Sequence, residues 1–128
     1  MKNTVVVGLG SNVQPQKNIA EVRDMIAERF KVLATSKFVA TKPIGMTQPG
    51  DFLNGAILIE TELAQDDLRS VLKEMEKKLG RVSTSEKYGP RTIDIDILTW
   101  NGSVIDQDFY ERDFVKNSVL ELCPQVKY

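Results

Sequence analysis

The chain has 128 residues, a formal net charge of −1, 41% hydrophobic residues and 27% charged residues. This length suits a single domain, residues 1–128, and the composition supports a buried core, which excludes a disordered chain or one of several ordinary domains. The near-neutral charge argues against broad electrostatic binding, so we expect neither nucleic acid nor a membrane surface as a partner.

Cysteine and histidine usage narrows the chemistry further. Cys123 is the only cysteine, so no intramolecular disulfide can form, and the apolar stretch near the start of the chain is too short for a signal peptide or a membrane span. We therefore expect a cytoplasmic protein. The chain has no histidine, which excludes imidazole as a general base or a metal ligand.

The first forty residues predict a strand, a helix and a second strand. Residues 4–8 form a β-branched run that ends in glycine, and residues 10–12 favour a turn. Apolar residues recur at three- and four-residue spacing over residues 16–29, which predicts an amphipathic helix. Residues 31–39 alternate loosely in polarity and favour a second strand.

The next part of the chain predicts two further strands around a second helix. Residues 42–51 hold two prolines and two glycines, which indicates a loop, and residues 52–61 return to a β-prone pattern. Helical periodicity marks residues 63–79. A polar loop over residues 81–92 then leads to a fourth strand at residues 93–98.

The order of these elements predicts a fold class. Strand–helix–strand–strand–helix–strand is the split βαβ arrangement, so we expect an α+β, ferredoxin-like βαββαβ sandwich. In that fold the sheet is antiparallel and the helices lie on one of its faces. Residues 101–128 show less regular patterning, and we expect them to be less regular in structure.

Two aspartates in the fourth predicted strand carry the strongest chemical signal. Asp94 and Asp96 alternate with isoleucines, so their side chains should share one face about 6.6–7 Å apart. Magnesium takes oxygen ligands and shares them with substrate phosphates, and Arg91 lies just upstream to bind such phosphates. The alternative is a strand with two solvated aspartates, and strand periodicity alone does not decide between the two.

Two other segments have residues that suit ligand binding. Residues 8–13 contain two glycines but lack the third glycine of a dinucleotide fingerprint, and the chain has no P-loop motif. We therefore expect Gly8 and Gly10 to permit a tight turn at the end of the first strand. Phe52 and Asn54 could stack on a flat heterocycle and bond its edge; the alternative is a core phenylalanine beside a turn asparagine.

Together these motifs resemble one known family. The run at residues 89–97, Gly-Pro-Arg-Thr-Ile-Asp-Ile-Asp-Ile, is similar to the signature of 6-hydroxymethyl-7,8-dihydropterin pyrophosphokinase, an enzyme of folate biosynthesis. The likeness extends to residues 10–12, residues 52–54 and residues 80–81 and covers most of the chain. It implies transfer of pyrophosphate from ATP to the pterin hydroxymethyl group: the hydroxyl attacks the β-phosphorus and AMP leaves.

The resemblance also implies roles for particular residues. It implies two magnesium ions held by Asp94 and Asp96, with ATP as co-substrate, and catalytic roles for Arg81, Arg91 and Asp96. The pterin site that it implies comprises Thr41, Pro43, Ile44, Phe52, Asn54 and Phe114. The ATP site that it implies comprises Lys73, Glu76, Arg81, Tyr88, Arg91, Ile97 and Arg112. The partners are then small molecules, and we expect a monomer or weak dimer.

The sequence departs from the family pattern on the nucleotide side. The stretch between Ile105 and Arg112 is several residues shorter than usual and lacks the family's ATP-contacting histidine. Ser83 replaces a second loop arginine, and Tyr88 stands where tryptophan is frequent. An alternative function is therefore a non-catalytic or weakly active relative that binds pterin or nucleotide. A ferredoxin-like regulatory or oligomerisation domain leaves the signature run unexplained.

Overall fold

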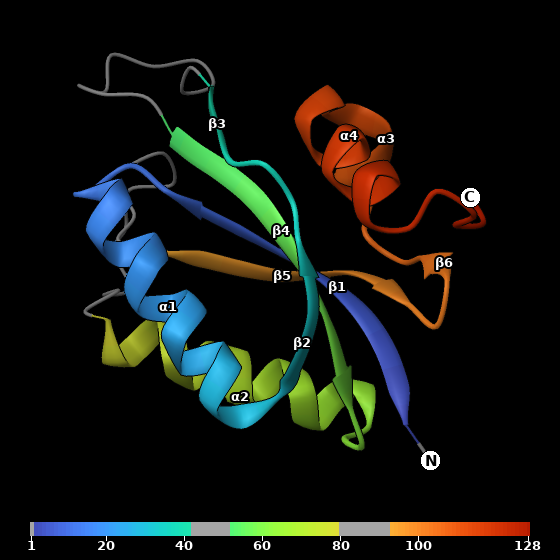
Figure 1. Ribbon diagram of the computed structural model, residues 1–128, viewed down its shortest axis with the longest axis horizontal. Helices are drawn as coiled ribbons and strands as arrows, with labels where there is room; N and C mark the ends of the chain where they lie inside the picture. The colour runs from blue at the N-terminus through green and yellow to red at the C-terminus, as the bar shows by residue number, and fades with distance from the viewer. Residues whose placement is uncertain (1, 42–51, 80–92) are drawn as a thin grey trace.

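A computed structural model describes residues 2–41, 52–79 and 93–128 of the chain (Figure 1). Its sheet has the order β2-β4-β1-β5-β6, with β3 also pairing to β4, and these described strands all pair in antiparallel fashion. The strands are β1 (Asn3–Ser11), β2 (Lys31–Thr35), β3 (Val39–Thr41), β4 (Phe52–Thr61), β5 (Asp94–Trp100) and β6 (Ser103–Val104).

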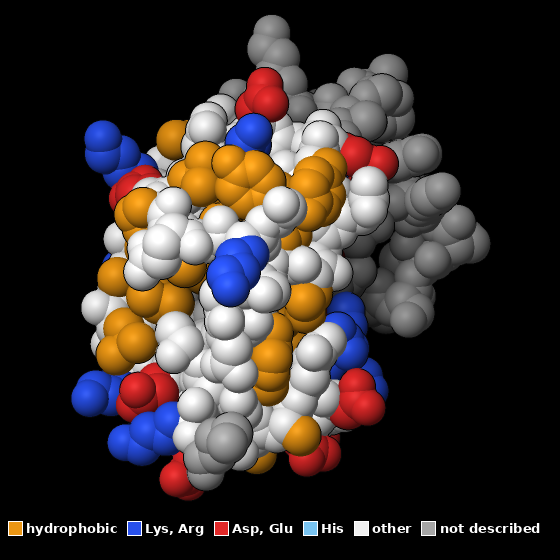
Figure 2. All heavy atoms as spheres, turned by 90° about the vertical axis from the view of Figure 1, so that its right-hand side faces the viewer, with side chains coloured by type: hydrophobic (Ala, Val, Ile, Leu, Met, Phe, Trp, Pro, Cys, Tyr) orange, Lys and Arg blue, Asp and Glu red, His pale blue; other side chains and the backbone are white. Residues whose placement is uncertain are grey.

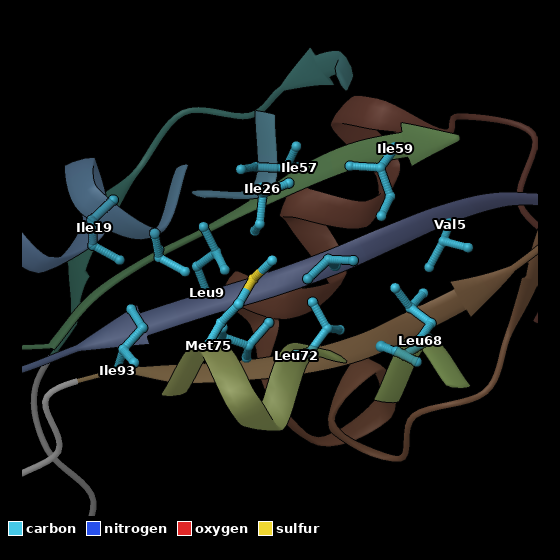
Figure 3. Packing of buried hydrophobic residues seen from close by; sticks show 14 residues of the cluster. Val5, Leu9, Ile19, Ile26, Ile57, Ile59, Leu68, Leu72, Met75 and Ile93 are labelled. Atoms are coloured by element: carbon cyan, nitrogen blue, oxygen red, sulfur yellow. The ribbon is translucent and has the colours of Figure 1, made fainter. Parts of the chain in front are cut away.

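Helices α1 (Pro15–Arg29) and α2 (Gln65–Lys78) pack on one face of the sheet (Figure 3). Helical spacing puts their apolar side chains on one stripe, and odd-numbered residues of β1, β4 and β5 meet that stripe. In α2, acidic residues in the first turn and basic residues in the last turn also favour the helix dipole. The buried set is Val5, Val7, Leu9, Ile19, Val22, Ile26, Ile57, Ile59, Leu68, Leu72, Met75, Ile93, Ile95 and Ile97.

The opposite face is covered in part by helices α3 (Asp108–Glu111) and α4 (Asp113–Leu122). A second apolar cluster joins them to the sheet and consists of Val6, Ala56, Leu98, Phe109, Val119 and Val126. Figure 2 views the molecule from the right-hand side of Figure 1, and hydrophobic side chains are visible at the surface there. Exposed apolar residues of the C-terminal segment are Ile105, Tyr110 and Tyr128. Within the described residues, no helix has both the length and the apolar character needed to cross a membrane.

The α+β, ferredoxin-like prediction with an antiparallel sheet is confirmed, and α1 and α2 lie on one face as expected. Two details of the prediction were wrong. The second predicted strand is divided into β2 and β3. Between them the N–H of Ala56 in β4 donates to the side-chain Oγ of Ser36, and the N–H of Lys37 donates to Glu121 of α4. The tail is more regular than predicted, since α3 and α4 add a layer on the face that the two longer helices leave open.

Candidate active site

Asp94 and Asp96 lie on the face of β5 that α1 and α2 do not cover. In the antiparallel register with β1, Asp94 is opposite Gly10 and Asp96 is opposite Gly8. The intervening Ile95 is buried in the core against the two helices. Because successive strand residues point to opposite faces, both carboxylates share one face, as the alternation in the sequence predicts.

Residues of β1 and β4 form the surface beside the two aspartates, which we call the floor of the site. Gly10 pairs with Asn54 of β4 on one side and with Asp94 of β5 on the other. A Cβ atom at Gly10 would lie 2.7 Å from Oδ1 of Asn54 and 3.9 Å from Cδ1 of Phe52. Because Gly10 has no side chain, the Asn54 carboxamide occupies the space above β1. The carboxamide therefore lies between the two aspartates and the Phe52 ring.

Gly8 marks the other boundary of the floor. A Cβ atom there would lie 2.9 Å from Cδ1 of Leu98, which belongs to the apolar cluster under α4. The prediction of a tight turn at Gly8 and Gly10 was wrong, because β1 continues through both to Ser11. Both glycines instead make room for side chains from adjacent strands, a tertiary requirement that glycine in a strand often marks.

Electrostatics at Asp96 favour a bound cation. Burial is the largest cause that raises the pKa of Asp96 from 3.8 to about 6, although part of the side chain is exposed to solvent. The carboxylates of Asp94, Asp106 and Glu76 raise this pKa further, while Lys73 lowers it. Several negative groups close to one another repel, and a cation between them would relieve that repulsion.

Asp106 is a neighbour that the sequence reasoning missed. It follows β6, and its Oδ1 accepts a hydrogen bond of 2.7 Å from the backbone N–H of Asp108 at the start of α3. Burial is the main cause that raises the pKa of Asp106, with Arg112 acting in the opposite direction. The shortened segment between Ile105 and Arg112 was noticed in the sequence, but nothing there predicted that its aspartate approaches Asp96.

The α2 side of β5 carries an ion pair between a buried carboxylate and a half-exposed lysine. Glu76 is 3% exposed, and its Oε2 accepts a hydrogen bond of 2.7 Å from the backbone N–H of Ile95. Its Oε1 lies 3.6 Å from Nζ of Lys73, whose side chain is 52% exposed. Lys73 thus reaches the surface beside β5, whereas the Glu76 carboxylate points inward.

Other predicted site residues have different surroundings. Ile97 is buried in the core between the sheet and the two long helices, so only its backbone is available to a ligand. Phe114 is half-buried in the first turn of α4, and Arg112 just before it pairs with Asp108 at 3.5 Å. Thr41 ends β3 opposite Phe52. The predictions for Pro43, Ile44, Arg81, Tyr88 and Arg91 concern positions outside the described residues.

The two carboxylates suit magnesium better than a metal ion whose ligands all come from protein side chains. No group of three or more His, Cys, Asp or Glu side chains that could hold a metal occurs in the described part of the chain. Two carboxylates on an accessible sheet face suit an ion that keeps water ligands and shares phosphate oxygens with a substrate. The residues present therefore fit magnesium carried in with a nucleotide.

Comparison with known proteins agrees with this chemistry. A family model described as 7,8-dihydro-6-hydroxymethylpterin-pyrophosphokinase matches residues 6–124. A 2-amino-4-hydroxy-6-hydroxymethyldihydropteridine pyrophosphokinase of Bacillus subtilis is 31% identical over 99% of this chain and 82% of its own length. The protein of the same name from Aquifex aeolicus is 35% identical over 96% of this chain and 82% of its own length.

A larger protein also contains a similar unit. The folate synthesis bifunctional protein of Arabidopsis thaliana is 34% identical over 92% of this chain, which spans 26% of that protein. The family match covers most of the chain, and the bacterial relatives are similar along nearly all of it. The chain therefore belongs to the 7,8-dihydro-6-hydroxymethylpterin-pyrophosphokinase family.

Proposed function

We propose that this chain binds 6-hydroxymethyl-7,8-dihydropterin and ATP on the sheet face that carries Asp94 and Asp96, and transfers pyrophosphate between them. As a member of its family the chain is an ATP-dependent pyrophosphokinase of folate biosynthesis. The observation that carries the proposed site is the arrangement of the two carboxylates beside Asn54, with only the bare Gly10 position of β1 between.

The proposed metal ligands are Asp94 and Asp96, and we propose two magnesium ions. Their shared face, together with the carboxylate repulsion at Asp96, supports this role. Magnesium held there supplies positive charge to the triphosphate and acidifies the pterin hydroxyl. The aspartates thereby orient the phosphates, and orientation with charge neutralisation provides most of the catalysis in phosphoryl transfer.

The proposed pterin site lies on the Asn54 side of the aspartates. Phe52 and Asn54 occupy alternate positions of β4 and so share the face of the metal ligands. Phe52 provides a ring for stacking and Asn54 provides both a donor and an acceptor for the heterocycle edge. Phe114 is the proposed second ring, and the proposed further contacts are Thr41, Pro43 and Ile44.

The proposed nucleotide side lies toward α2 and the C-terminal layer. The half-exposed Lys73 stands beside β5, close enough to lower the pKa of Asp96. Its ammonium group can therefore reach phosphates held by the aspartates. The further proposed ATP contacts are Tyr88, Arg112 and the backbone of Ile97. Two more are Arg81 and Arg91, which we also propose as phosphate clamps.

The reaction forms one bond and breaks one. The pterin hydroxyl oxygen bonds to the β-phosphorus of ATP, the bond from that phosphorus to the α-phosphate bridging oxygen breaks, and the hydroxyl proton leaves to solvent. AMP carries away the bridging oxygen. We further propose that the enzyme acts in the cytosol, which its single cysteine supports, and as a monomer or weak dimer.

The test is product analysis. The purified chain is incubated with 6-hydroxymethyl-7,8-dihydropterin, ATP and magnesium, and we expect AMP and pterin pyrophosphate in equal amounts. Omission of magnesium or of the pterin should abolish both products. Pterin binding by calorimetry with no AMP release would contradict the proposal and support the non-catalytic alternative, which neither the site geometry nor the comparisons favour.

A further inference from the structure

The Glu76 carboxylate is a buried charge that the proposed reaction does not use. It is 3% exposed and accepts a 2.7 Å hydrogen bond from the N–H of Ile95, the residue between the two aspartates. Burying a carboxylate is costly unless it is paired and hydrogen-bonded.

This hydrogen bond lies at the outer edge of β5. β5 pairs with β1 from Asp94 to Trp100, but its other edge pairs with β6 only at Thr99 and Trp100. Among the described residues, no strand therefore covers the outer edge of β5 beside the aspartates. Glu76 of α2 accepts one backbone N–H at that edge, as a neighbouring strand would.

We propose that Glu76 is a positioning residue: its bond to the N–H of Ile95 fixes the depth and twist of β5, and hence the relative placement of the Asp94 and Asp96 carboxylates. The inference rests on the proposed metal role of those aspartates. It replaces the direct nucleotide contact that the family resemblance implies for Glu76, because Oε2 bonds β5 and Oε1 faces Lys73 at 3.6 Å.

The role depends on an acceptor atom at the right reach rather than on negative charge. Glu76→Gln keeps a side-chain oxygen at the same distance from the helix. Glu76→Asp keeps the charge but is shorter by one carbon–carbon bond of about 1.5 Å, which takes its oxygens out of hydrogen-bond range of Ile95. The two variants therefore separate reach from charge, and neither leaves a large cavity in the core.

The experiment measures metal affinity directly. Manganese(II) is titrated into the full chain in the presence of a non-hydrolysable ATP analogue, and free manganese is followed by electron paramagnetic resonance. Loss of a group that orients metal ligands weakens metal binding by about 10-fold or more, so we expect that loss in Glu76→Asp. We expect Glu76→Gln to stay within about twofold of the unmodified chain. Amide hydrogen exchange at Ile95 should accelerate only in Glu76→Asp.

Thr99→Val is the matched control. Thr99 is buried on the same strand, and its Oγ1 accepts a hydrogen bond of 3.1 Å from the N–H of Val6. Its loss should lower stability without changing manganese affinity. Stronger metal binding by Glu76→Asp than by Glu76→Gln, or unchanged binding in both, would overturn the positioning role alone. Absence of manganese binding by the unmodified chain would instead overturn the proposed metal role.

Discussion

The two faces of the central sheet use the same strands for different purposes. Toward α1 and α2, the central parts of the strands present apolar side chains such as Val7, Ile57 and Ile95, and these three are at most 2% exposed. On the other face, Gly8 lies across from Asp96. Each strand residue thus contributes mainly to one face, because side chains alternate with a period of two.

The difference shows that alternate residues of the same strand serve two purposes: one set stabilises the fold, and the other binds ligands. The apolar face holds β5 at a fixed depth, while the opposite face keeps small or polar residues where ligands must approach. Substitutions on the first face should therefore reduce stability, and substitutions beside the aspartates and Asn54 on the second face should reduce activity or ligand affinity.

The largest expected effect is loss of a metal ligand. Asp94→Ala or Asp96→Ala should reduce the rate of AMP formation by about 100- to 1,000-fold or more, the range for removal of one preorganised electrostatic group. The measurement is steady-state AMP release at saturating substrates. Asp66→Asn, an exposed acidic position in the first turn of α2, should retain the full rate. Full activity in either alanine variant would contradict the metal role.

The next effect concerns the apolar face. Ile57 is 1% exposed in the core between the sheet and α1 and α2 (Figure 3). Ile57→Ala should lower the free energy of unfolding by about 2–5 kcal/mol, because it removes buried contacts and leaves a cavity. Urea denaturation measures this change, and Leu33→Ala, at a 42% exposed position, should alter it by less than about 0.5 kcal/mol.

Activity measurements complete the comparison of the two faces. At temperatures where Ile57→Ala is fully folded, its KM for the pterin should equal that of the unmodified chain, because Ile57 lies on the opposite face from Asn54. A large increase in this KM without loss of stability would show that the two faces are not separable in the way proposed.

A smaller effect is expected at the floor of the site. In Gly10→Ala the new Cβ would lie 2.7 Å from Oδ1 of Asn54, so the carboxamide must move. Loss of one hydrogen bond of about 1 kcal/mol should raise the pterin Kd by about fivefold, as measured by calorimetry. Gly8→Ala is the control: it presses on Leu98 of the second cluster and should reduce stability but not pterin affinity.

Local patterns predicted the scaffold better than the site. The bounds of β4 agree with the predicted range, and helical periodicity found both long helices, because their apolar stripes repeat within the chain. The course of β1 through Gly8 and Gly10 could not be predicted, since the space there is filled by Leu98 and Asn54 of other strands.

The same limit applies to the charges around Asp96. The alternation of Asp94 and Asp96 with isoleucines is local, so their shared face could be predicted from sequence. The bond between Glu76 and Ile95 spans 19 residues, and the approach of Asp106 depends on the path of the chain after β6. For Glu76 the family resemblance implied an ATP contact, and the one further signal was a glutamate at a core-facing position of α2.

The smallest effect tests whether the site weakens the fold that carries it. The pKa of Asp96 is raised in the folded chain from 3.8 to about 6, chiefly by burial and then by Asp94. A raised acid pKa means that ionisation opposes folding: the penalty is absent below pH 3.8, develops up to about pH 6 and is complete above it. Asp96→Asn should therefore raise the free energy of unfolding at pH 7.5 and leave it unchanged near pH 3.5.

The gain at pH 7.5 should be about 1 kcal/mol or less, because the exposed part of Asp96 is screened by solvent. Thermal unfolding of both chains without magnesium, at matched pH values, measures the difference. Asp108→Asn serves as a control at an exposed carboxylate paired with Arg112. An Asp96→Asn effect that is the same at both pH values cannot come from carboxylate ionisation. It would mean that ionisation of Asp96 beside Asp94 does not lower the free energy of unfolding in the absence of a cation.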